Sequence, residues 1–273
     1  MRQRALPALL AVLCAAFLLL MSHHPLLAPL VVFFLSTAIT VALWEFLEIA
    51  KKKYFDFPLS ISLVFSFIYS FSVFYQTTHA SKIPLAQIVF SVFVFLSFML
   101  AFFTTKNAIS NLSINIFAFV YVVMSLSKII ELLYQEQGVI LVFYLLLTTK
   151  VCDTAAFFGG YFFGKTKIFP FLSPKKTLEG AIAGILGSMA LSFFFVLVLP
   201  LSFSRLLILS FFMALFAQAG DLAESLIKRD AEVKDSNQIP GLGGILDIFD
   251  SLIFTSPFLS FIYSLGLVYD YHH

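Results

Sequence analysis

Charged residues are scarce in this chain. Lys, Arg, Asp and Glu make up 12% of its 273 residues, whereas 60% of the residues are hydrophobic. Soluble globular domains carry about 25% charged residues, so the composition excludes that class. The net charge of +2 is too small to indicate a surface for nucleic acid, and we expect no such partner. The composition indicates an all-α, polytopic integral membrane protein whose surroundings are the lipid bilayer.

Cysteine is nearly absent as well. Only Cys14 and Cys152 occur, and each lies inside an apolar run. We therefore expect neither a structural disulfide nor a metal site built from cysteines, and we interpret both residues as small buried side chains.

Long apolar runs dominate what is present. Runs of about 20 residues, the length that crosses a bilayer, predict about nine transmembrane helices. The first run follows Arg2 and Arg4 as in a signal peptide, but no small-residue cleavage site follows it, so we expect a retained helix. The predicted spans are residues 5–21, 26–48, 57–75, 84–104, 110–127, 137–152, 180–200, 205–222 and 244–266.

The positions of the cationic residues agree with this count. With the N-terminus in the cytoplasm, the inner segments contain fourteen Lys and Arg residues and the outer segments three, Lys82, Lys128 and Arg205. Such an excess is typical of cytoplasmic loops. Both long polar stretches, 153–179 and 223–243, then face the cytoplasm.

This pattern divides the chain into N-terminal transmembrane helices, residues 1–152, and a C-terminal membrane region with both polar stretches, residues 153–273. The first part contains few side chains suited to catalysis. Its exceptions are Glu45 and Glu48, which precede three lysines at 51–53. They either face the site or mark the membrane boundary, and the sequence leaves both interpretations open.

The first polar stretch matches the P-loop spacing through Gly159, Gly164, Lys165 and Thr166. A P-loop lies between a strand and a helix, whereas here a membrane span precedes and two prolines follow, so we reject that interpretation. The glycines and Lys165 still permit backbone and ammonium groups to approach a phosphate.

Hydroxyl and ammonium groups gather directly before the next predicted span. These residues are Ser173, Lys175, Lys176 and Thr177. The two lysines either bind a substrate phosphate or anchor the span to anionic lipid headgroups.

The densest charge cluster lies at residues 220–251 and is flanked by apolar runs. Charged groups beside hydrocarbon are costly, which indicates a functional site. Asp221, Ser225 and Lys228 follow one another at i, i+4 and i+7, so a helix continuing from the preceding span carries them on one face. The alternative is a network in which the charges only neutralise one another.

A glycine-rich turn and two aspartates complete this cluster. Gly241, Gly243 and Gly244 exclude a regular helix and allow backbone N–H groups to approach a ligand. Asp247 and Asp250 follow at i, i+3 near the start of the last span. Carboxylates converging with hydroxyl and backbone oxygens suit Mg²⁺, which prefers a few carboxylates together with substrate phosphates.

These residues resemble the signature of the phosphatidate cytidylyltransferase, or CDP-diacylglycerol synthase, family. Together with a second family motif, which Asp153, residues 173–177, Glu179 and Gly180 resemble, the likeness covers roughly residues 150–255. Leu242 and Ile248 depart from the pattern, because the family has His and Arg there. The residues that match the signature are Ser225, Lys228, Arg229, Lys234, Asp235, Pro240, Gly241, Gly243, Gly244, Asp247 and Asp250.

The resemblance implies a nucleotidyltransferase that transfers CMP from CTP to phosphatidate and releases CDP-diacylglycerol and pyrophosphate at the cytoplasmic leaflet. It implies Mg²⁺ as cofactor and CTP and phosphatidate as partners, and it leaves a homodimer open. The implied metal ligands are Asp221 and Asp247, with Ser225, Asp235 and Asp250 as further ligands or partners of the ligands. The implied catalytic cations are Lys228, Arg229 and Lys234. The implied substrate-binding residues are Lys165, Ser173, Lys175, Lys176, Thr177, Gly241, Gly243 and Gly244.

Three other functions remain open at this point. A membrane lipid kinase that uses CTP to phosphorylate a polyprenol or phytol would release CDP instead of pyrophosphate. A transporter would bury the same charges in an ion pathway. An inactive relative that retains the fold is the interpretation that Leu242 and Ile248 favour.

Overall fold

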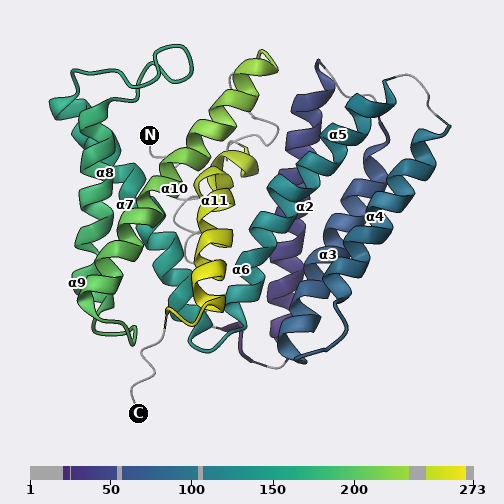
Figure 1. The fold of residues 1–273 in the computed structure, drawn as a ribbon, viewed down its shortest axis with the longest axis horizontal. Coiled ribbons are helices and arrows are strands. Elements are labelled where there is room, and N and C mark those ends of the chain that lie inside the picture. The colour runs from purple at the N-terminus through teal and green to yellow at the C-terminus, as the bar shows by residue number, and fades with distance from the viewer. Residues whose placement is uncertain (1–20, 25, 54–56, 104–106, 234–243, 269–273) are drawn as a thin grey trace. The chain divides into compact units, whose positions relative to one another are not determined.

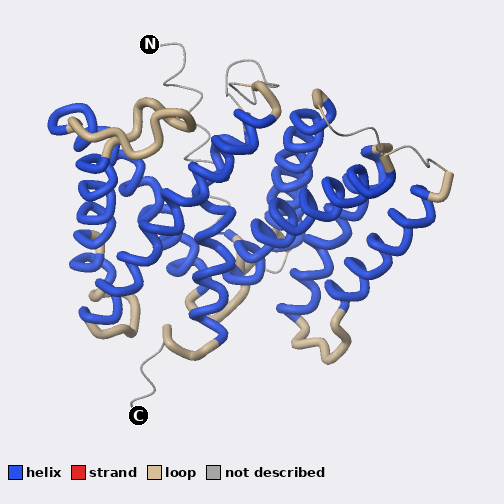
Figure 2. Tube along the Cα trace, turned by 45° about the horizontal axis from the view of Figure 1, so that its top comes forward, coloured by secondary structure: helices blue, strands red, loops and turns tan. Residues whose placement is uncertain are grey.

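The computed structural model describes residues 21–24, 26–53, 57–103, 107–233 and 244–268. Within these ranges all the regular elements are helices, as Figure 2 shows. The all-α prediction is therefore confirmed for the described residues. The elements, labelled in Figure 1, are α2 (Ala28–Lys51), α3 (Leu59–Thr78), α4 (Leu85–Ala101), α5 (Ala108–Ala118), the π-helix η1 (Phe119–Met124), α6 (Ser125–Leu133), α7 (Gly138–Phe163), α8 (Leu178–Ala190), α9 (Ser192–Phe195), α10 (Phe203–Asp230) and α11 (Ile245–Ser264).

Seven helical stretches among the described residues are long and apolar enough to cross a bilayer. Two of them combine shorter elements, because α5, η1 and α6 run on as Ala108–Leu133, and α8 and α9 as Leu178–Phe195. The run predicted at 84–104 forms the shorter helix α4, with 17 residues. The run predicted at 5–21 lies outside the described residues. The chain is thus a polytopic helical membrane protein, but the count of nine spans is not supported.

One predicted boundary between span and loop is wrong, and a second helix runs past its predicted span, as the spacing of Asp221, Ser225 and Lys228 indicated. The span predicted to end at 152 continues as α7 to Phe163, and the span predicted to end at 222 continues as α10 to Asp230. In α7 the carboxylate of Asp153 is compatible with the helix because the Lys150 ammonium, one turn earlier, lies 3.5 Å from it. Asp153 therefore lies on a long helix, although it had been assigned to a loop from the sequence.

The helices pack into two compact units. The first contains residues 1–139 and 231–249, and the second contains residues 140–230 and 250–273. Each unit therefore combines residues from both sides of the division that the sequence places between 152 and 153.

In the first unit, hydrogen bonds between buried polar side chains join α3 to its neighbours. The Ser62 hydroxyl donates to the Asn115 carbonyl at 2.6 Å, and the Asn115 amide donates to the Ser97 hydroxyl at 3.1 Å. The hydroxyls of Ser66 and Thr40 pair at 3.1 Å, so α2 is joined to α3 in the same way. Apolar side chains gain little from packing against one another in lipid, so such polar contacts help to specify helix pairing.

In the second unit, small residues allow α7 and α8 to approach closely. A Cβ atom on Gly159 would lie 2.3 Å from the Ala183 Cβ, and one on Gly187 would lie 2.6 Å from the Ala155 Cβ. Close backbone approach at small residues is a common way to pack membrane helices. In the same unit the rings of Phe216 on α10 and Phe258 on α11 lie 4.5 Å apart between centroids. These contacts pack α7 against α8 and α10 against α11.

Replacing Asn115 with Ala is expected to destabilise the first unit. The substitution removes hydrogen bonds to both α3 and α4 and leaves the buried Ser62 hydroxyl to find another acceptor, which costs about 1–3 kcal/mol, whereas the Ser97 hydroxyl still donates to the Phe93 carbonyl. Thermal unfolding of the purified protein in detergent measures the effect. Ser91→Ala is the matched control, because the exposed Ser91 hydroxyl bonds only to the Gln87 carbonyl of its own helix among the contacts described. Equal melting temperatures for the two variants would contradict the assignment.

Candidate active site

The segment at 164–177, between α7 and α8, is fixed by the first turn of α8. The Glu179 carboxylate accepts hydrogen bonds from the backbone N–H groups of Lys165, at 3.0 Å, and Thr166, at 3.2 Å. The Thr177 hydroxyl accepts from the Gly180 N–H at 3.2 Å and so caps the N-terminus of α8. A β-bridge between Lys167 and Thr177 closes the segment on itself. The lysines of this segment are therefore held on an ordered backbone.

Helix α10 holds the same segment from the other side. The Arg229 guanidinium donates from Nε to the backbone carbonyl of Leu172 at 3.3 Å. Arg229 is itself exposed and lies one residue before the end of α10. Its described contact is therefore structural, since it joins the C-terminal end of α10 to the segment that carries Ser173, Lys175 and Lys176.

A cavity of about 610 Å³ lies between α7, α8, α10 and this segment. That volume falls within the range of about 300–1,000 Å³ typical of small-molecule sites. One part of the wall is aromatic, with Phe157 and Tyr161 from α7 and Phe169 from the segment. The charged residues of the wall are Asp153, Lys167, Lys175, Lys176 and Asp221. An amphiphilic anion, with a charged group beside an apolar one, matches such a lining.

The shortest polar contact described in the cavity wall is an ion pair between Lys176 and Asp221. The Lys176 Nζ lies 2.7 Å from the Asp221 Oδ2, and each side chain is about one-third exposed. At this distance in a partly desolvated site, opposite charges stabilise each other more than they would in water. The pair brings together one residue from each of the two polar stretches that the sequence singled out.

Helices α10 and α11 meet directly beside Asp221. A Cβ atom on Gly220 would lie 2.4 Å from the backbone carbonyl oxygen of Asp250, so only glycine fits at this crossing. The Asp250 carboxylate accepts hydrogen bonds from the backbone N–H and, at 3.0 Å, the hydroxyl of Ser251. The crossing therefore brings Asp250 close to Asp221, although the two residues are 29 positions apart.

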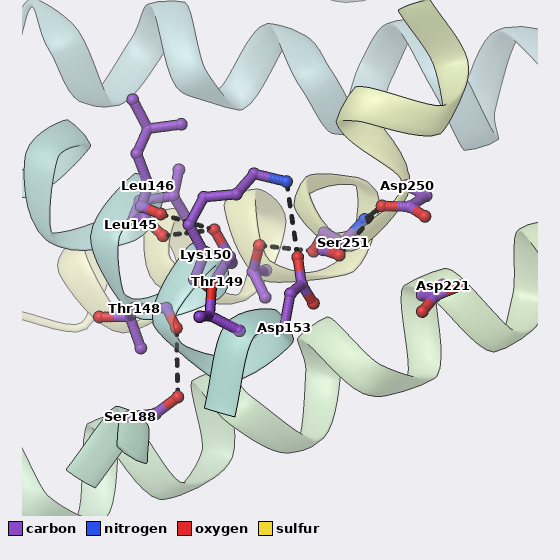
Figure 3. A network of polar contacts seen from close by, with 12 residues as sticks. Leu145, Leu146, Thr148, Thr149, Lys150, Asp153, Ser188, Asp221, Asp250 and Ser251 are labelled. Atoms are coloured by element: carbon purple, nitrogen blue, oxygen red, sulfur yellow. Dashed lines mark hydrogen bonds and ion pairs between the residues drawn. The ribbon is translucent and has the colours of Figure 1, made fainter. Parts of the chain in front are cut away.

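Asp153 is a third carboxylate in this region. The negative charge of Asp221 acts on both Asp153 and Asp250, and that of Asp153 acts on Asp250. Figure 3 shows the three carboxylates together, one each from α7, α10 and α11, with Lys150 reaching toward Asp153. Sequence reasoning quoted Asp153 as part of a motif but did not select it as a site residue. In the sequence, Asp153 could have been recognised as a single acidic residue within an apolar run.

Other predicted residues of α10 lie away from the cavity lining. Lys228 is buried and its Nζ lies 3.0 Å from the Oε1 of Glu224, which is also buried. Ser225 is half-buried on the same helix, and the prediction that the helix continues through Ser225 and Lys228 is confirmed. Whether Lys228 meets a phosphate stays a prediction.

Some of the remaining predicted residues lie within the described part of the chain and others lie outside it. Asp247 is half-buried in the first turn of α11, Gly244 is buried just before that helix, and Ile248 is exposed on it. Lys165 is exposed and, like Thr166, donates its N–H to Glu179. The predicted residues that lie outside the described part of the chain are Lys234, Asp235, Gly241 and Gly243, together with Leu242.

The described residues contain no group of three or more His, Cys, Asp or Glu side chains close enough to hold a metal ion by themselves. The predicted ligands Asp221 and Asp247 belong to different compact units. The donor chemistry at Asp153, Asp221 and Asp250 nevertheless fits Mg²⁺, which takes one or two carboxylates and completes its coordination with water and substrate phosphates. The magnesium site stays a prediction.

Comparison with known proteins gives consistent results over the length of the chain. The model of the cytidylyltransferase family matches residues 2–265. A phosphatidate cytidylyltransferase of Bacillus subtilis is 34% identical over 274 residues, which cover 97% of this chain and 98% of that protein. One of Chlamydia pneumoniae is 31% identical over 93% of this chain and 89% of its own length. One of Haemophilus influenzae is 29% identical over 96% of this chain and 98% of its own length.

Replacing Gly220 with Ala is expected to destabilise the protein. Alanine is the better helix former by about 1 kcal/mol, but its methyl group would collide with the Asp250 carbonyl and force α10 and α11 apart, at a cost of about 1–3 kcal/mol. Thermal unfolding in detergent measures the balance. Gly160→Ala is the matched control, because a Cβ atom there would first meet the Thr177 Oγ1, at 3.1 Å, and that atom belongs to a side chain. A melting temperature for Gly220→Ala at or above that of the control would contradict the crossing.

Proposed function

The chain belongs to the cytidylyltransferase family, and we propose that it transfers CMP from CTP to phosphatidate with the reacting phosphates in the cavity lined by Lys176 and Asp221. The products are CDP-diacylglycerol and pyrophosphate. The lining of the cavity supports this placement, because three ammonium groups and two carboxylates lie there beside aromatic rings.

The chemistry joins two anions and therefore depends on charge neutralisation. An oxygen of the phosphatidate phosphate attacks the α-phosphorus of CTP, the bond from that phosphorus to the bridging oxygen of the β-phosphate breaks, and pyrophosphate leaves with the bonding electrons. No general base is required, because a phosphate monoester is already ionised at neutral pH. The work of the site is to hold the phosphates in line and to stabilise the developing charge.

The lysines of the cavity wall supply the positive charge. Lys167 and Lys175 are exposed at the cavity, whereas Lys176 is held by Asp221 at 2.7 Å. In our proposal the exposed pair meets the incoming phosphates first. Lys176 is oriented by Asp221 and keeps its remaining N–H donors for a phosphate oxygen. The aromatic side of the cavity accommodates the glycerol and the first part of the acyl chains.

Magnesium is part of the proposal. Asp221 would hold it, with Asp153 or Asp250 as a second carboxylate, and Asp247 stays the further ligand that the sequence predicts. Bound Mg²⁺ supplies positive charge at the triphosphate. The carboxylates of this chain hold and orient that charge, and Ser251 fixes Asp250 through its N–H and hydroxyl. Lys228, Arg229 and Lys234 are proposed to hold the phosphates, and Ser225 and Asp235 are proposed to ligate the metal ion or to support its ligands.

We also propose the orientation in the membrane. The spans at 5–21 and at α4, added to the seven long helices, give nine crossings and a cytoplasmic N-terminus. This arrangement follows from the distribution of Lys and Arg. It puts the segment at 164–177 on the cytoplasmic side of a bacterial inner membrane, where CTP is present. A site at this boundary takes a water-soluble nucleotide from one side and a lipid from the other.

A product assay separates this function from that of a CTP-dependent lipid kinase. Purified protein in mixed micelles of detergent and phosphatidate, supplied with labelled CTP and Mg²⁺, is expected to release CDP-diacylglycerol and pyrophosphate in equal amounts. Asp221→Ala is expected to lower this rate by about 10²–10³-fold, because the carboxylate that orients Lys176 and ligates magnesium is lost. Release of CDP with a phosphorylated alcohol, when polyprenol replaces phosphatidate, would instead identify a kinase.

Removal of the Lys176 charge tests whether the reacting phosphates bind in this cavity. Lys176→Met keeps most of the side-chain volume but removes the ammonium group, and kcat/KM is expected to fall by about 10²–10³-fold. The control is Lys82→Met, which removes an exposed cation between α3 and α4. Full activity of a well-folded Lys176→Met protein would place the reacting phosphates elsewhere.

A further inference from the structure

Glu45 is a buried carboxylate that lies far from the cavity residues in sequence and lies against the start of the last helix. It belongs to α2, and its side chain is fully buried. Its Oε2 accepts a hydrogen bond of 2.8 Å from the backbone N–H of Leu246, a residue 201 positions later. Both residues belong to the first compact unit.

This contact provides an acceptor for one of the backbone N–H groups that have no partner at the start of a helix. Leu246 is the second residue of α11, and the first four N–H groups of a helix lack partners within it. A carboxylate at this end is also favoured by the helix dipole. An ionised side chain is expensive to bury unless such partners compensate it, and the Leu246 N–H is one such partner.

The same helix carries two of the predicted site carboxylates. Asp247 directly follows Leu246, and Asp250 lies one turn further along α11. Each residue of a helix advances by about 1.5 Å and rotates by about 100°, so fixing the first turn also fixes where the following side chains project.

We propose that Glu45 is a positioning residue for the transfer reaction: its carboxylate fixes the first turn of α11 and so orients Asp247, the residue after Leu246, as a ligand of the metal ion. This inference rests on the proposed function, because the orientation of Asp247 matters only if this aspartate acts in CMP transfer. Glu45 itself touches no substrate.

Glu48 provides an internal comparison. It lies one turn later on α2, and its carboxylate pairs with the Lys51 ammonium at 2.9 Å in a partly exposed position. The sequence left the same two interpretations open for both glutamates. The structure separates them, because Glu45 contacts the helix of the predicted site, whereas the described partner of Glu48 is a lysine of its own helix.

The experiment compares Glu45→Ala, Glu45→Gln and Glu45→Asp with Glu48→Gln. Hydrogen–deuterium exchange is measured for the peptide that covers the first turn of α11, and the rate of CMP transfer is measured against Mg²⁺ and CTP concentration. With Glu45→Ala, exchange in that peptide is expected to rise while peptides of α7 and α8 stay unchanged. Its kcat is expected to fall by about 10–100-fold, with more Mg²⁺ needed for half-maximal rate.

The conservative variants separate positioning from folding. Glu45→Gln keeps an acceptor oxygen for the Leu246 N–H and is expected to recover part of the rate that Glu45→Ala loses. Glu48→Gln is expected to match the wild-type protein in both exchange and rate. If Glu45→Ala does not fold, Glu45→Gln and Glu45→Asp are compared in the same two measurements.

Unchanged exchange at the start of α11, or an unchanged Mg²⁺ requirement in all the folded Glu45 variants, would overturn the inference. If the wild-type protein transfers no CMP, the proposed function is wrong. In that case the exchange measurement still decides whether Glu45 fixes the helix.

Discussion

The ion pair between Lys176 and Asp221 is the contact on which the site depends. It joins the segment between α7 and α8 to the middle of α10, and it does so across the cavity where the phosphates are proposed to lie. In a chain with so little charge, each ionised group at the membrane needs a partner. Glu179 and Arg229 serve the same segment by holding backbone groups at 3.0 and 3.3 Å. The charges of the site are therefore ordered before any substrate is bound, which is the condition for electrostatic catalysis.

The site also requires helices whose backbones lie close together, and glycine residues allow this approach. At Gly220 the backbone of α10 approaches the Asp250 carbonyl, and at Gly159 and Gly187 α7 meets α8 through alanine side chains. Such close crossings bring Asp153, Asp221 and Asp250 from three helices within electrostatic reach of one another. Larger side chains at these crossings would separate the helices and with them the carboxylates.

Apolar length and charge density in the sequence were enough to predict a helical membrane protein and the location of its polar cluster. The continuous helix through Asp221, Ser225 and Lys228 followed from their spacing. The end of α7 was misplaced because Asp153 was taken as the start of a loop, although Lys150 one turn earlier compensates its charge. The Gly220–Asp250 crossing and the Glu45–Leu246 hydrogen bond could not be predicted, since one sequence contains no information on distances between remote residues. Lys234, Asp235, Gly241 and Gly243 lie outside the described residues, and their roles stay predictions.

The composition of the first compact unit has a consequence for how the protein is made. That unit contains residues 1–139 but also 231–249, so its last part leaves the ribosome only after residues 140–230 of the second unit have been synthesised. Until then the carboxylate of Glu45 has no Leu246 N–H to accept from, and it must stay hydrated, protonated or bound to something else while the membrane helices insert. Insertion and assembly are therefore separate events for α2. Contacts between residues so far apart along a chain form slowly, because a long loop must close first. A nascent chain that stops before residue 246 would contain every lysine of the cavity wall, yet its first unit would still be incomplete.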